Sequence, residues 1–236
     1  MAKSELEKQN IIIIGASGHA SVIIDIIERQ NIYTIVGLID SYKPLGTTLF
    51  DYEVLGNEQI LPQLIKSHHV IGGIIAIGDN YSRRVMFNKI QGTVPDFNFV
   101  TAIHPNATIG KSVQIGKGTV IMPGAIANAN AVISDFCILN TASTLGHDSK
   151  MDHFSSLAPG VNIAGNVTIK TSSSIGIGSC IIGGISIGSH THIGAGSTVI
   201  KSIADFKLAY GNPAIEMRSR QVDENHLGLK SKNDMR

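Results

Sequence analysis

The chain has 236 residues, which is enough for one large domain or two small ones. Its formal net charge of +1 provides no basic field for the phosphates of a nucleic acid, so we expect no nucleic-acid partner. Two cysteines fit a reducing cytoplasm, and the first apolar run is only IIII, too short for a signal peptide or a membrane span. We therefore expect a soluble, cytoplasmic protein.

The first hundred residues alternate between strand-like and helix-like segments. They begin with an apolar run, IIII, a Gly-rich turn, GASGH, and apolar residues at helical spacing, VIIDII. Two further strand-like segments follow, YTIVGLIDS (33–41) and GGIIAIGDN (72–80). This alternation predicts a small parallel α/β domain over residues 1–100, equivalent to half of a doubly wound, Rossmann-like fold.

The predicted strand ends carry the candidate ligand-binding residues, because ligands of parallel α/β sheets bind at the carboxyl ends of the strands. Those ends are expected at Gly15–His19, Asp40–Lys43 and Gly78–Asn80. The turn lacks the full G-x-G-x-x-G dinucleotide pattern, but its two glycines let backbone N–H groups approach a phosphate. Asp40 follows Gly15 by 25 residues, near where a ribose-binding carboxylate would lie. The pattern favours a mononucleotide, although a simple tight turn has the same signature.

The second half of the chain contains a six-residue repeat. From Ile103 to Val199, sixteen of seventeen positions at this spacing carry a large aliphatic residue, with Ala127 as the exception. Two positions before each lies a second register of small or modest β-branched residues, Ile185 excepted. Such a period is typical of a parallel β-helix, in which three hexapeptides form one 18-residue triangular coil. Ordinary buried strands have a period of two and would not keep this phase.

The physical logic of such a prism explains both registers. The large side chains point inward and stack on residues of the next coil, and each burial stabilises the fold by about 1.5–3 kcal/mol. The small partners also point inward and leave room for them. Glycine often follows the large residue, as at Gly110 and Gly146, and we expect it to form the tight corner.

Five segments carry a resemblance that covers nearly the whole chain: IIIIGASGHASVIIDII, AIGDN, ILNTASTLGHDS, FSSLAPGVNIAGNV and YGNPA. The chain resembles bacterial hexapeptide-repeat acetyltransferases of nucleotide-linked amino sugars, with sialic acid O-acetyltransferases nearby. It is most similar to the UDP-4-amino-4,6-dideoxy-N-acetylglucosamine N-acetyltransferases of the diacetyl-bacillosamine pathway. The resemblance implies a left-handed β-helix over residues 101–215, a homotrimer, and acetyl-CoA bound between neighbouring β-helices. Residues 216–236 are polar without an apolar period and are expected to form a C-terminal tail.

The resemblance also assigns the catalytic base. His147 occupies the histidine of the family's L-x-H-[ED] pattern, within LGHDS, and Asp148 matches the acidic residue after it. The imidazole would remove a proton from the substrate amine as its nitrogen attacks the thioester, and the carboxylate would raise its basicity. Direct attack needs no acyl-enzyme, and Cys137 lies on an inward register, so we interpret Cys137 as a core residue.

Two sets of binding residues follow from the same resemblance. For the UDP-amino sugar they are Ser17, Gly18, His19, Asp40, Ser41, Gly78 and Asn80. For acetyl-CoA they are Asn140, Ser156, Gly165, Ile177, Gly178, Ala195, Gly211 and Pro213. No metal site is expected.

Several alternatives stay open on the sequence. One is a sialic acid or other sugar O-acetyltransferase, and another is an N-acetyltransferase of a dTDP- or GDP-amino sugar, because all would use the same histidine. Trimeric hexapeptide β-helices also include zinc carbonic anhydrases, which need three histidines around one metal. His147 and His153 are six residues apart and would point in different directions. A non-enzymatic binding scaffold is the fourth alternative.

Overall fold

The computed structural model describes residues 8–227, which form two compact units. The first unit comprises the described residues up to Ile77 together with Met86–Pro105. The second comprises Gly78–Val85 and the described residues from Asn106 onward. None of the helices between residues 8 and 227 has both the length and the apolar character needed to cross a bilayer.

The first unit contains a three-stranded parallel sheet in the order β2-β1-β5. Its elements are β1 (Gln9–Ile14), α1 (Gly18–Gln30), β2 (Tyr33–Ile39), β3 (Thr48–Leu49), β4 (Tyr52–Glu53), the 3-10 helix η1 (Glu58–Ile60), α2 (Leu61–Ser67), β5 (Val70–Ile75), most of α3 (Asn80–Thr93) and β6 (Ala102–Ile103). The four isoleucines of β1 are fully buried, as are those on the inner face of α1. Because β2 and β5 flank β1 on opposite sides, the strand order reverses at β1, which is where such sheets form a ligand crevice.

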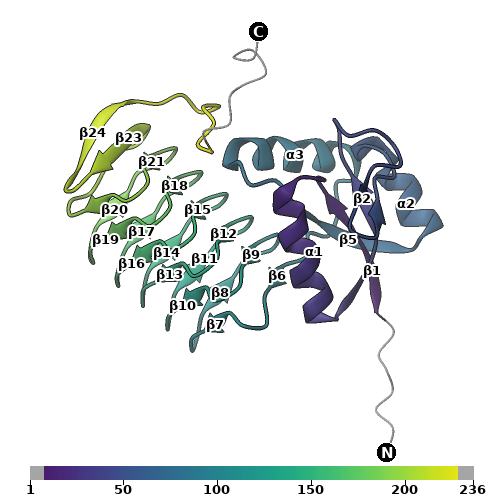
Figure 1. Cartoon of the computed structure of the whole chain (residues 1–236), viewed down its shortest axis with the longest axis horizontal. Coiled ribbons are helices and arrows are strands. Elements are labelled where there is room, and N and C mark those ends of the chain that lie inside the picture. Colours follow the sequence, from purple (N-terminus) through teal and green to yellow (C-terminus); the bar gives the residue numbers. More distant parts are fainter. Residues whose placement is uncertain (1–7, 228–236) are drawn as a thin grey trace, which may run out of the picture. The chain divides into compact units, whose positions relative to one another are not determined.

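The second unit is dominated by two-residue parallel strands that stack into a prism, the β-helix of Figure 1. The strands are β7 (Thr108–Ile109), β8 (Gln114–Ile115), β9 (Val120–Ile121), β10 (Ile126–Ala127), β11 (Val132–Ile133), β12 (Ile138–Leu139), β13 (Thr144–Leu145), β14 (Lys150–Met151), β15 (Ser156–Leu157), β16 (Asn162–Ile163), β17 (Thr168–Ile169), β18 (Ser174–Ile175), β19 (Cys180–Ile181), β20 (Ser186–Ile187), β21 (His192–Ile193) and β22 (Thr198–Val199). Every strand pairs with strands eighteen residues away, as Leu145 does with Ile163. The predicted α/β half domain followed by a parallel β-helix is confirmed, and the architecture is consistent with the left-handed winding that the resemblance implies.

The prism has three faces, which we number in chain order. The first face contains six strands, β7, β10, β13, β16, β19 and β22. The second contains β8, β11, β14, β17 and β20, and the third includes β9, β12, β15, β18 and β21. The first corner follows the first face, the second corner follows the second face, and the third corner follows the third face. Each 18-residue coil therefore contributes one segment to each corner.

Both inward registers behave as predicted. From Ile121 to Val199 every member of the large aliphatic register is buried, whereas Ile109 in the first coil is exposed. The small register makes hydrogen bonds that the sequence pattern does not reveal. Ser149 Oγ donates to the carbonyl of Ala164 (3.0 Å) and accepts from the N–H of Val167 (3.0 Å). Inward hydroxyls thus satisfy backbone groups where successive coils cross a corner.

The glycine after a large residue does lie in the corner, but it does not adopt the left-handed conformation that makes the turn. The left-handed backbone conformation recurs every six residues, two positions after the glycine. Many residues other than glycine adopt it, among them Ser112 (φ 61°) and Asp148 (φ 56°). Gly146 instead faces the next coil, where a Cβ would lie 2.2 Å from the carbonyl oxygen of Ala164. Close approach of the coils, and not the turn, therefore demands glycine there.

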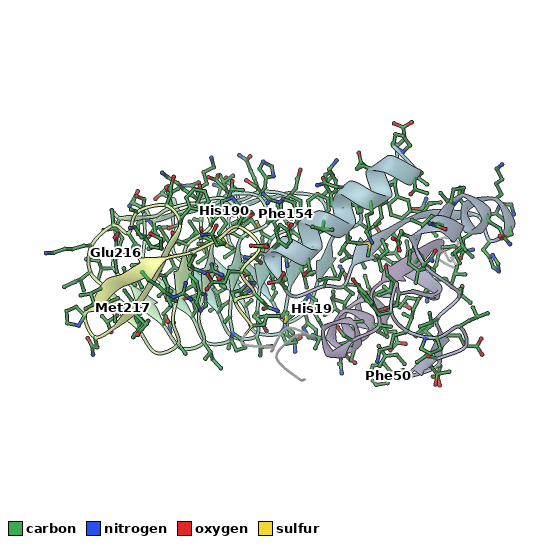
Figure 2. All side chains as sticks on the ribbon, turned by 90° about the horizontal axis from the view of Figure 1, so that it is seen from above. His19, Phe50, Phe154, His190, Glu216 and Met217 are labelled. Atoms are coloured by element: carbon green, nitrogen blue, oxygen red, sulfur yellow. The ribbon has the colours of Figure 1, made fainter. Side chains whose placement is uncertain are left out.

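The chain after the β-helix is ordered further than predicted. β23 (Lys207–Gly211) and β24 (Ala214–Ser219) form an antiparallel hairpin, with Tyr210 paired to Ile215. The expected tail from residue 216 therefore begins inside a strand that carries Glu216 and Met217 (Figure 2). Backbone hydrogen bonds between β23 and β24 hold this polar segment in place. Its sequence has no apolar period, so the strand could not be predicted from the pattern. Residues 228–236 lie outside the described residues.

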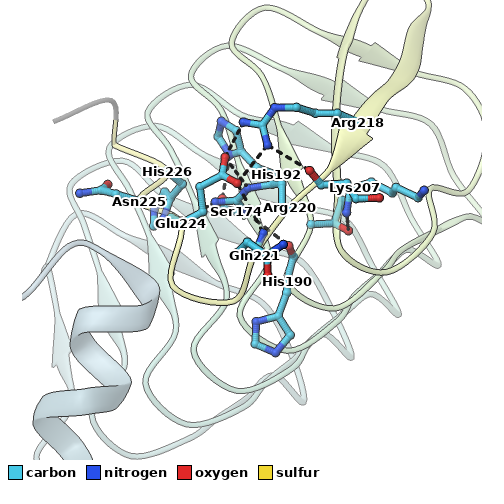
Figure 3. Close-up of polar contacts among 12 residues, drawn as sticks. Ser174, His190, His192, Lys207, Arg218, Arg220, Gln221, Glu224, Asn225 and His226 are labelled. Carbon is cyan, nitrogen blue, oxygen red and sulfur yellow. Dashed lines mark hydrogen bonds and ion pairs between the residues drawn. The ribbon is translucent and has the colours of Figure 1, made fainter. Parts of the chain in front are cut away.

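The described residues after β24 return to the second corner and the third face. Arg220 is buried and donates to the carbonyl of His190 (Nη1–O 3.4 Å). Glu224 pairs with Arg218 (Nη2–Oε1 2.5 Å) and lies 3.5 Å from Nε of Arg220 (Figure 3). The hydrogen bond from Arg218 is the main reason that the pKa of Glu224 falls to about 2. His226 Nδ1 lies 3.1 Å from Asp79 Oδ2 at the start of α3.

Candidate active site

The strongest catalytic geometry lies at the first corner. His147 Nδ1 is 2.7 Å from Asp148 Oδ2, and Asn130 donates to the other carboxylate oxygen at 3.0 Å. These two hydrogen bonds, first that from His147 and then that from Asn130, lower the pKa of Asp148. A carboxylate only accepts hydrogen bonds, so the proton of the neutral imidazole lies on Nδ1. Nε2 is left with a free lone pair, which is what a general base requires.

Glycine provides the space for this imidazole. A Cβ on Gly165, one coil further along the first corner, would lie 2.4 Å from His147 Nε2. The next coil has Gly183, where a Cβ would approach the carbonyl oxygen of Gly165 to 2.9 Å. The ring therefore lies over bare backbone, and the His147 side chain is 61% exposed. The backbone N–H of Gly165 donates to no acceptor within residues 8–227.

The other residues predicted to bind acetyl-CoA lie elsewhere on the β-helix. Asn140, Ile177, Gly178 and Ala195 are at the third corner, where Ile177 is exposed and Asn140 Oδ1 accepts from the N–H of Thr141 (2.8 Å). The first and third corners are the two edges of the first face. One chain therefore brings His147 together with Gly165 but keeps both apart from the third-corner residues.

The remaining three members of that set lie in two further places. Ser156 belongs to β15 on the third face and is only 7% exposed. Gly211 at the end of β23 and Pro213 in the turn to β24 are both exposed. Ser156 thus offers little surface for a ligand, whereas the hairpin turn is open to solvent.

In the first unit, the turn from Gly15 to His19 connects β1 to α1. Gly15 has a φ of 114° and its Cβ would lie 2.9 Å from the carbonyl of Ala76, so the turn needs glycine there. A Cβ on Gly18 would meet nothing within 4 Å, and the exposed Ser17 makes no side-chain cap hydrogen bond. The space above the helix start is therefore open, and His19 is half-buried beside it.

Asp40 connects this turn to the loop after β2. Its Oδ2 accepts from the N–H of Ala16 (2.9 Å), and its Oδ1 accepts from those of Tyr42 (2.8 Å) and Lys43 (3.1 Å). The carboxylate is thus engaged by backbone and shapes the ends of two neighbouring strands. Ser41 donates to Glu58 Oε2 (2.7 Å), which fixes its hydroxyl within the protein.

Gly78–Asn80 belongs to the second unit, where the side chain of Asn80 has internal partners. Asn80 is 2% exposed: its Nδ2 donates to the carbonyl of Ser173 (3.1 Å) and its Oδ1 accepts from Arg83 (2.8 Å). The side chain predicted to contact the nucleotide sugar is therefore committed inside the protein, because a residue this buried needs internal partners. Sequence reasoning missed Arg83, whose only signal is an arginine in the first turn of an unpredicted helix.

Metal-binding geometry is not found within residues 8–227, where no three His, Cys, Asp or Glu side chains are arranged to hold an ion. His147 is at the first corner and His153 at the second, 3.8 Å from Asp135. The histidines that a zinc site would need thus occupy different corners of the prism.

Comparison with known proteins identifies relatives of both units. Residues 10–90 match the family described as the PglD N-terminal domain. The chain is 30% identical to the perosamine N-acetyltransferase of Caulobacter crescentus, in a variant with one histidine replaced by asparagine, in complex with CoA and GDP-perosamine; the TM-score is 0.84, covering 92% of this chain and 100% of that one.

Two further solved structures are similar over comparable lengths. The acetyltransferase domain of PglB from Neisseria gonorrhoeae FA1090, in complex with acetyl coenzyme A, is 30% identical with a TM-score of 0.81, covering 89% of this chain and 100% of that one. WeeI from Acinetobacter baumannii AYE is 26% identical with a TM-score of 0.80, again covering 89% of this chain and all of that one.

Proposed function

This chain belongs to the hexapeptide-repeat family of nucleotide-sugar acetyltransferases, and we propose that it transfers the acetyl group of acetyl-CoA to the 4-amino group of a UDP-linked amino-dideoxy sugar. The observation that carries this proposal is the His147–Asp148 pair at the first corner. It combines a solvent-accessible imidazole, a fixed tautomer and a glycine that leaves room beside the ring.

The chemistry follows from that geometry. Nε2 of His147 removes a proton from the amine as its nitrogen attacks the thioester carbonyl, and Asp148 stabilises the imidazolium that forms. We assign the N–H of Gly165, which donates to no acceptor within residues 8–227, to the oxyanion of the tetrahedral intermediate. When the C–S bond breaks, the imidazolium returns its proton to the CoA thiolate. No acyl-enzyme is formed, and the buried Cys137 takes no part.

Binding of the two substrates is assigned to the two units. The open turn at Ser17 and Gly18, at the carboxyl end of β1, binds the nucleotide diphosphate through backbone N–H groups. The third-corner residues Ile177 and Ala195, with the hairpin turn, bind acetyl-CoA. Since these lie on the opposite edge of the first face from His147, we propose that a second copy of the chain in a homotrimer completes the groove.

A GDP-linked amino sugar is the second candidate substrate. The observation that favours it is the relative of 30% identity that binds CoA and GDP-perosamine. Both candidates place the reactive amine on the sugar and the same imidazole beside it, so the nucleotide alone distinguishes them.

The test is an acetyl-CoA consumption assay of the purified protein against UDP-, dTDP- and GDP-linked 4-amino sugars, with sialic acid as a hydroxyl acceptor. We expect turnover with a UDP-amino sugar, and preference for a GDP-sugar or for sialic acid would contradict the proposed specificity. We expect His147→Ala to lower kcat by roughly 10²–10⁴-fold while acetyl-CoA affinity stays within a few fold.

His153→Ala is the matched control for that variant. It also removes an exposed histidine beside an aspartate, but at the second corner. We expect it to retain wild-type turnover. A His147→Ala protein that keeps its activity would exclude His147 as the base.

A further inference from the structure

Arg83 is the most deeply buried charged residue among the described residues of the second unit, at 1% exposure. Its guanidinium donates from Nε to the carbonyl of Phe136 (2.9 Å) and from Nη2 to that of Phe154 (3.2 Å). Nη1 donates to the carbonyl of Gly78 (2.8 Å), and Nη2 also donates to Asn80 Oδ1 (2.8 Å). One planar group thus joins two coils of the β-helix to the segment that precedes α3.

Burying a charged group lowers the stability of the folded state unless each of its hydrogen-bond donors has an acceptor, so the position of Arg83 depends on these contacts. Burial lowers the pKa of Arg83 to about 10, which still leaves the group protonated at neutral pH. The acceptors are neutral carbonyl and amide oxygens that match the fork of a guanidinium. A lysine ammonium is a compact point charge and cannot reach the same set of oxygens.

The two coil carbonyls come from a well-packed part of the β-helix. Phe136 and Phe154 occupy successive levels of the second corner, and their rings stack with centroids 4.9 Å apart and an interplanar angle of 5°. Both residues are buried. Arg83 therefore attaches the segment before α3 to a well-packed edge of the catalytic β-helix.

The attached segment is Gly78–Asn80, which follows the sheet strand β5 in the chain and was predicted to contact the nucleotide sugar. Arg83 holds it on both sides, at the carbonyl of Gly78 and the side chain of Asn80. Between them, Asp79 accepts from the N–H (2.8 Å) and the hydroxyl (2.7 Å) of Ser82. With the side chains of Asp79 and Asn80 engaged, the groups left for a ligand are those of the backbone.

We propose that Arg83 is a positioning residue for the nucleotide sugar: it fixes the backbone of Gly78–Asn80 against the β-helix, so that the bound sugar is held at a constant place relative to the catalytic corner. This inference rests on the proposed function. It assigns Arg83 no contact with either substrate. Its loss should therefore weaken nucleotide-sugar binding and leave acetyl-CoA binding unchanged.

The test compares Arg83→Lys and Arg83→Gln with the wild type in steady-state kinetics, using the UDP- and GDP-linked amino sugars as probes. For Arg83→Lys, which keeps the buried charge, we expect a rise of about tenfold in KM for the nucleotide sugar, because the unanchored segment would adopt the binding-competent conformation only about a tenth of the time. KM for acetyl-CoA should change by less than about twofold. Arg83→Gln should raise KM for the nucleotide sugar further, again with little change in KM for acetyl-CoA.

Asn80→Ala gives an independent measurement if Arg83→Gln does not fold. It removes one acceptor of the guanidinium, and its effect on KM for the nucleotide sugar should be less than additive with that of Arg83→Lys, because the two residues act through one contact. Arg84→Gln is the control, since Arg84 on the same helix lies over the Tyr81 ring (5.8 Å) and outside this network. It should leave both KM values unchanged.

A role limited to folding would lower the melting temperature and the active fraction of Arg83→Lys while leaving both KM values as in the wild type, and this result would overturn the inference. Equal rises in both KM values, or additive effects with Asn80→Ala, would also overturn it. A wild type that acetylates no member of the panel overturns the proposed function together with this inference. An active wild type with an unaffected Arg83→Lys overturns this inference alone.

Discussion

At the scale of single residues, the candidate site depends on the two groups that lie on either side of the His147 imidazole, Asp148 and Gly165. Asp148 adopts a left-handed backbone conformation (φ 56°), which turns its carboxylate back onto His147 Nδ1. Gly165 leaves the other side of the ring bare. The resemblance to a known family singled out His147 as the candidate, whereas the contact of its ring with Gly165 depends on which residue lies one coil away.

Asp148→Asn tests the carboxylate without disturbing the backbone, because asparagine tolerates the left-handed region well. The new amide has a donor facing the donor of Asn130, and it provides no negative charge for the imidazolium. We expect kcat to fall roughly a hundredfold with little change in KM for acetyl-CoA. Asp135→Asn, at the carboxylate beside His153, is the control and should keep wild-type kcat. A wild-type kcat in Asp148→Asn would show that His147 needs no anionic partner.

At the scale of elements, the polar contacts of β21 make stability depend on pH. His192 Nδ1 lies 2.8 Å from Ser174 Oγ, and its ring centroid is 6.0 Å from that of His226. Burial, and then the positive charges of His226 and Arg220, lower the pKa of His192 to about 4. The folded protein therefore resists protonation of this ring, although Glu224 opposes the shift.

The sign of the pH effect follows from that lowered pKa. An unfolded histidine titrates near ~6.5, so between about pH 6.5 and 4 the unfolded chain binds more protons, and the free energy of unfolding falls as pH decreases. We expect His192 to contribute a loss on the order of 3 kcal/mol from pH 7 to 4. Denaturant titrations at several pH values should show a flatter profile for His192→Gln.

The exposed His153 provides the comparison for that measurement. His153→Gln should keep the wild-type slope of unfolding free energy against pH. If His192→Gln and wild type lose stability in parallel, the ring of His192 is not the group that titrates.

At the scale of the whole molecule, His147 at the first corner and the proposed acetyl-CoA residues at the third corner are on different edges of one chain. The proposed homotrimer would bring the first corner of one subunit to the third corner of its neighbour. If His147 of one subunit serves acetyl-CoA bound at the third corner of its neighbour, two inactive variants can complement each other. We expect His147→Ala and Ala195→Arg each to be inactive. Refolded together in equal amounts, random trimers should recover about a quarter of wild-type activity, because half of the subunits retain each intact corner.

The outcome separates the two arrangements of the groove. If both corners of one subunit formed the same site, every site would carry one defect and no activity would return. Mixing the variants without refolding, so that existing assemblies stay intact, provides the baseline.

Much of this architecture was predictable, because a fixed period reports directly on the packing of neighbouring coils. The inward registers and the α/β half domain follow from local patterns, and His147 is a candidate because of the family resemblance. The roles of Asn80 and Arg83 do not, since they depend on carbonyl groups contributed by Phe136 and Phe154, far away in the chain. The hairpin of β23 and β24 was missed because backbone pairing, and not an apolar pattern, holds it together.

The constant pairing distance along the β-helix limits how such proteins can change length. Each strand contacts the strand eighteen residues away, so an insertion or deletion within the strands that is not a multiple of eighteen residues would move all later strands onto other faces of the prism. Removal of one complete turn between β16 and the hairpin would preserve every inward contact beyond it and shift the end of the prism by one level. Duplication or loss of whole turns is therefore a route by which genes of this architecture can vary the length of the prism.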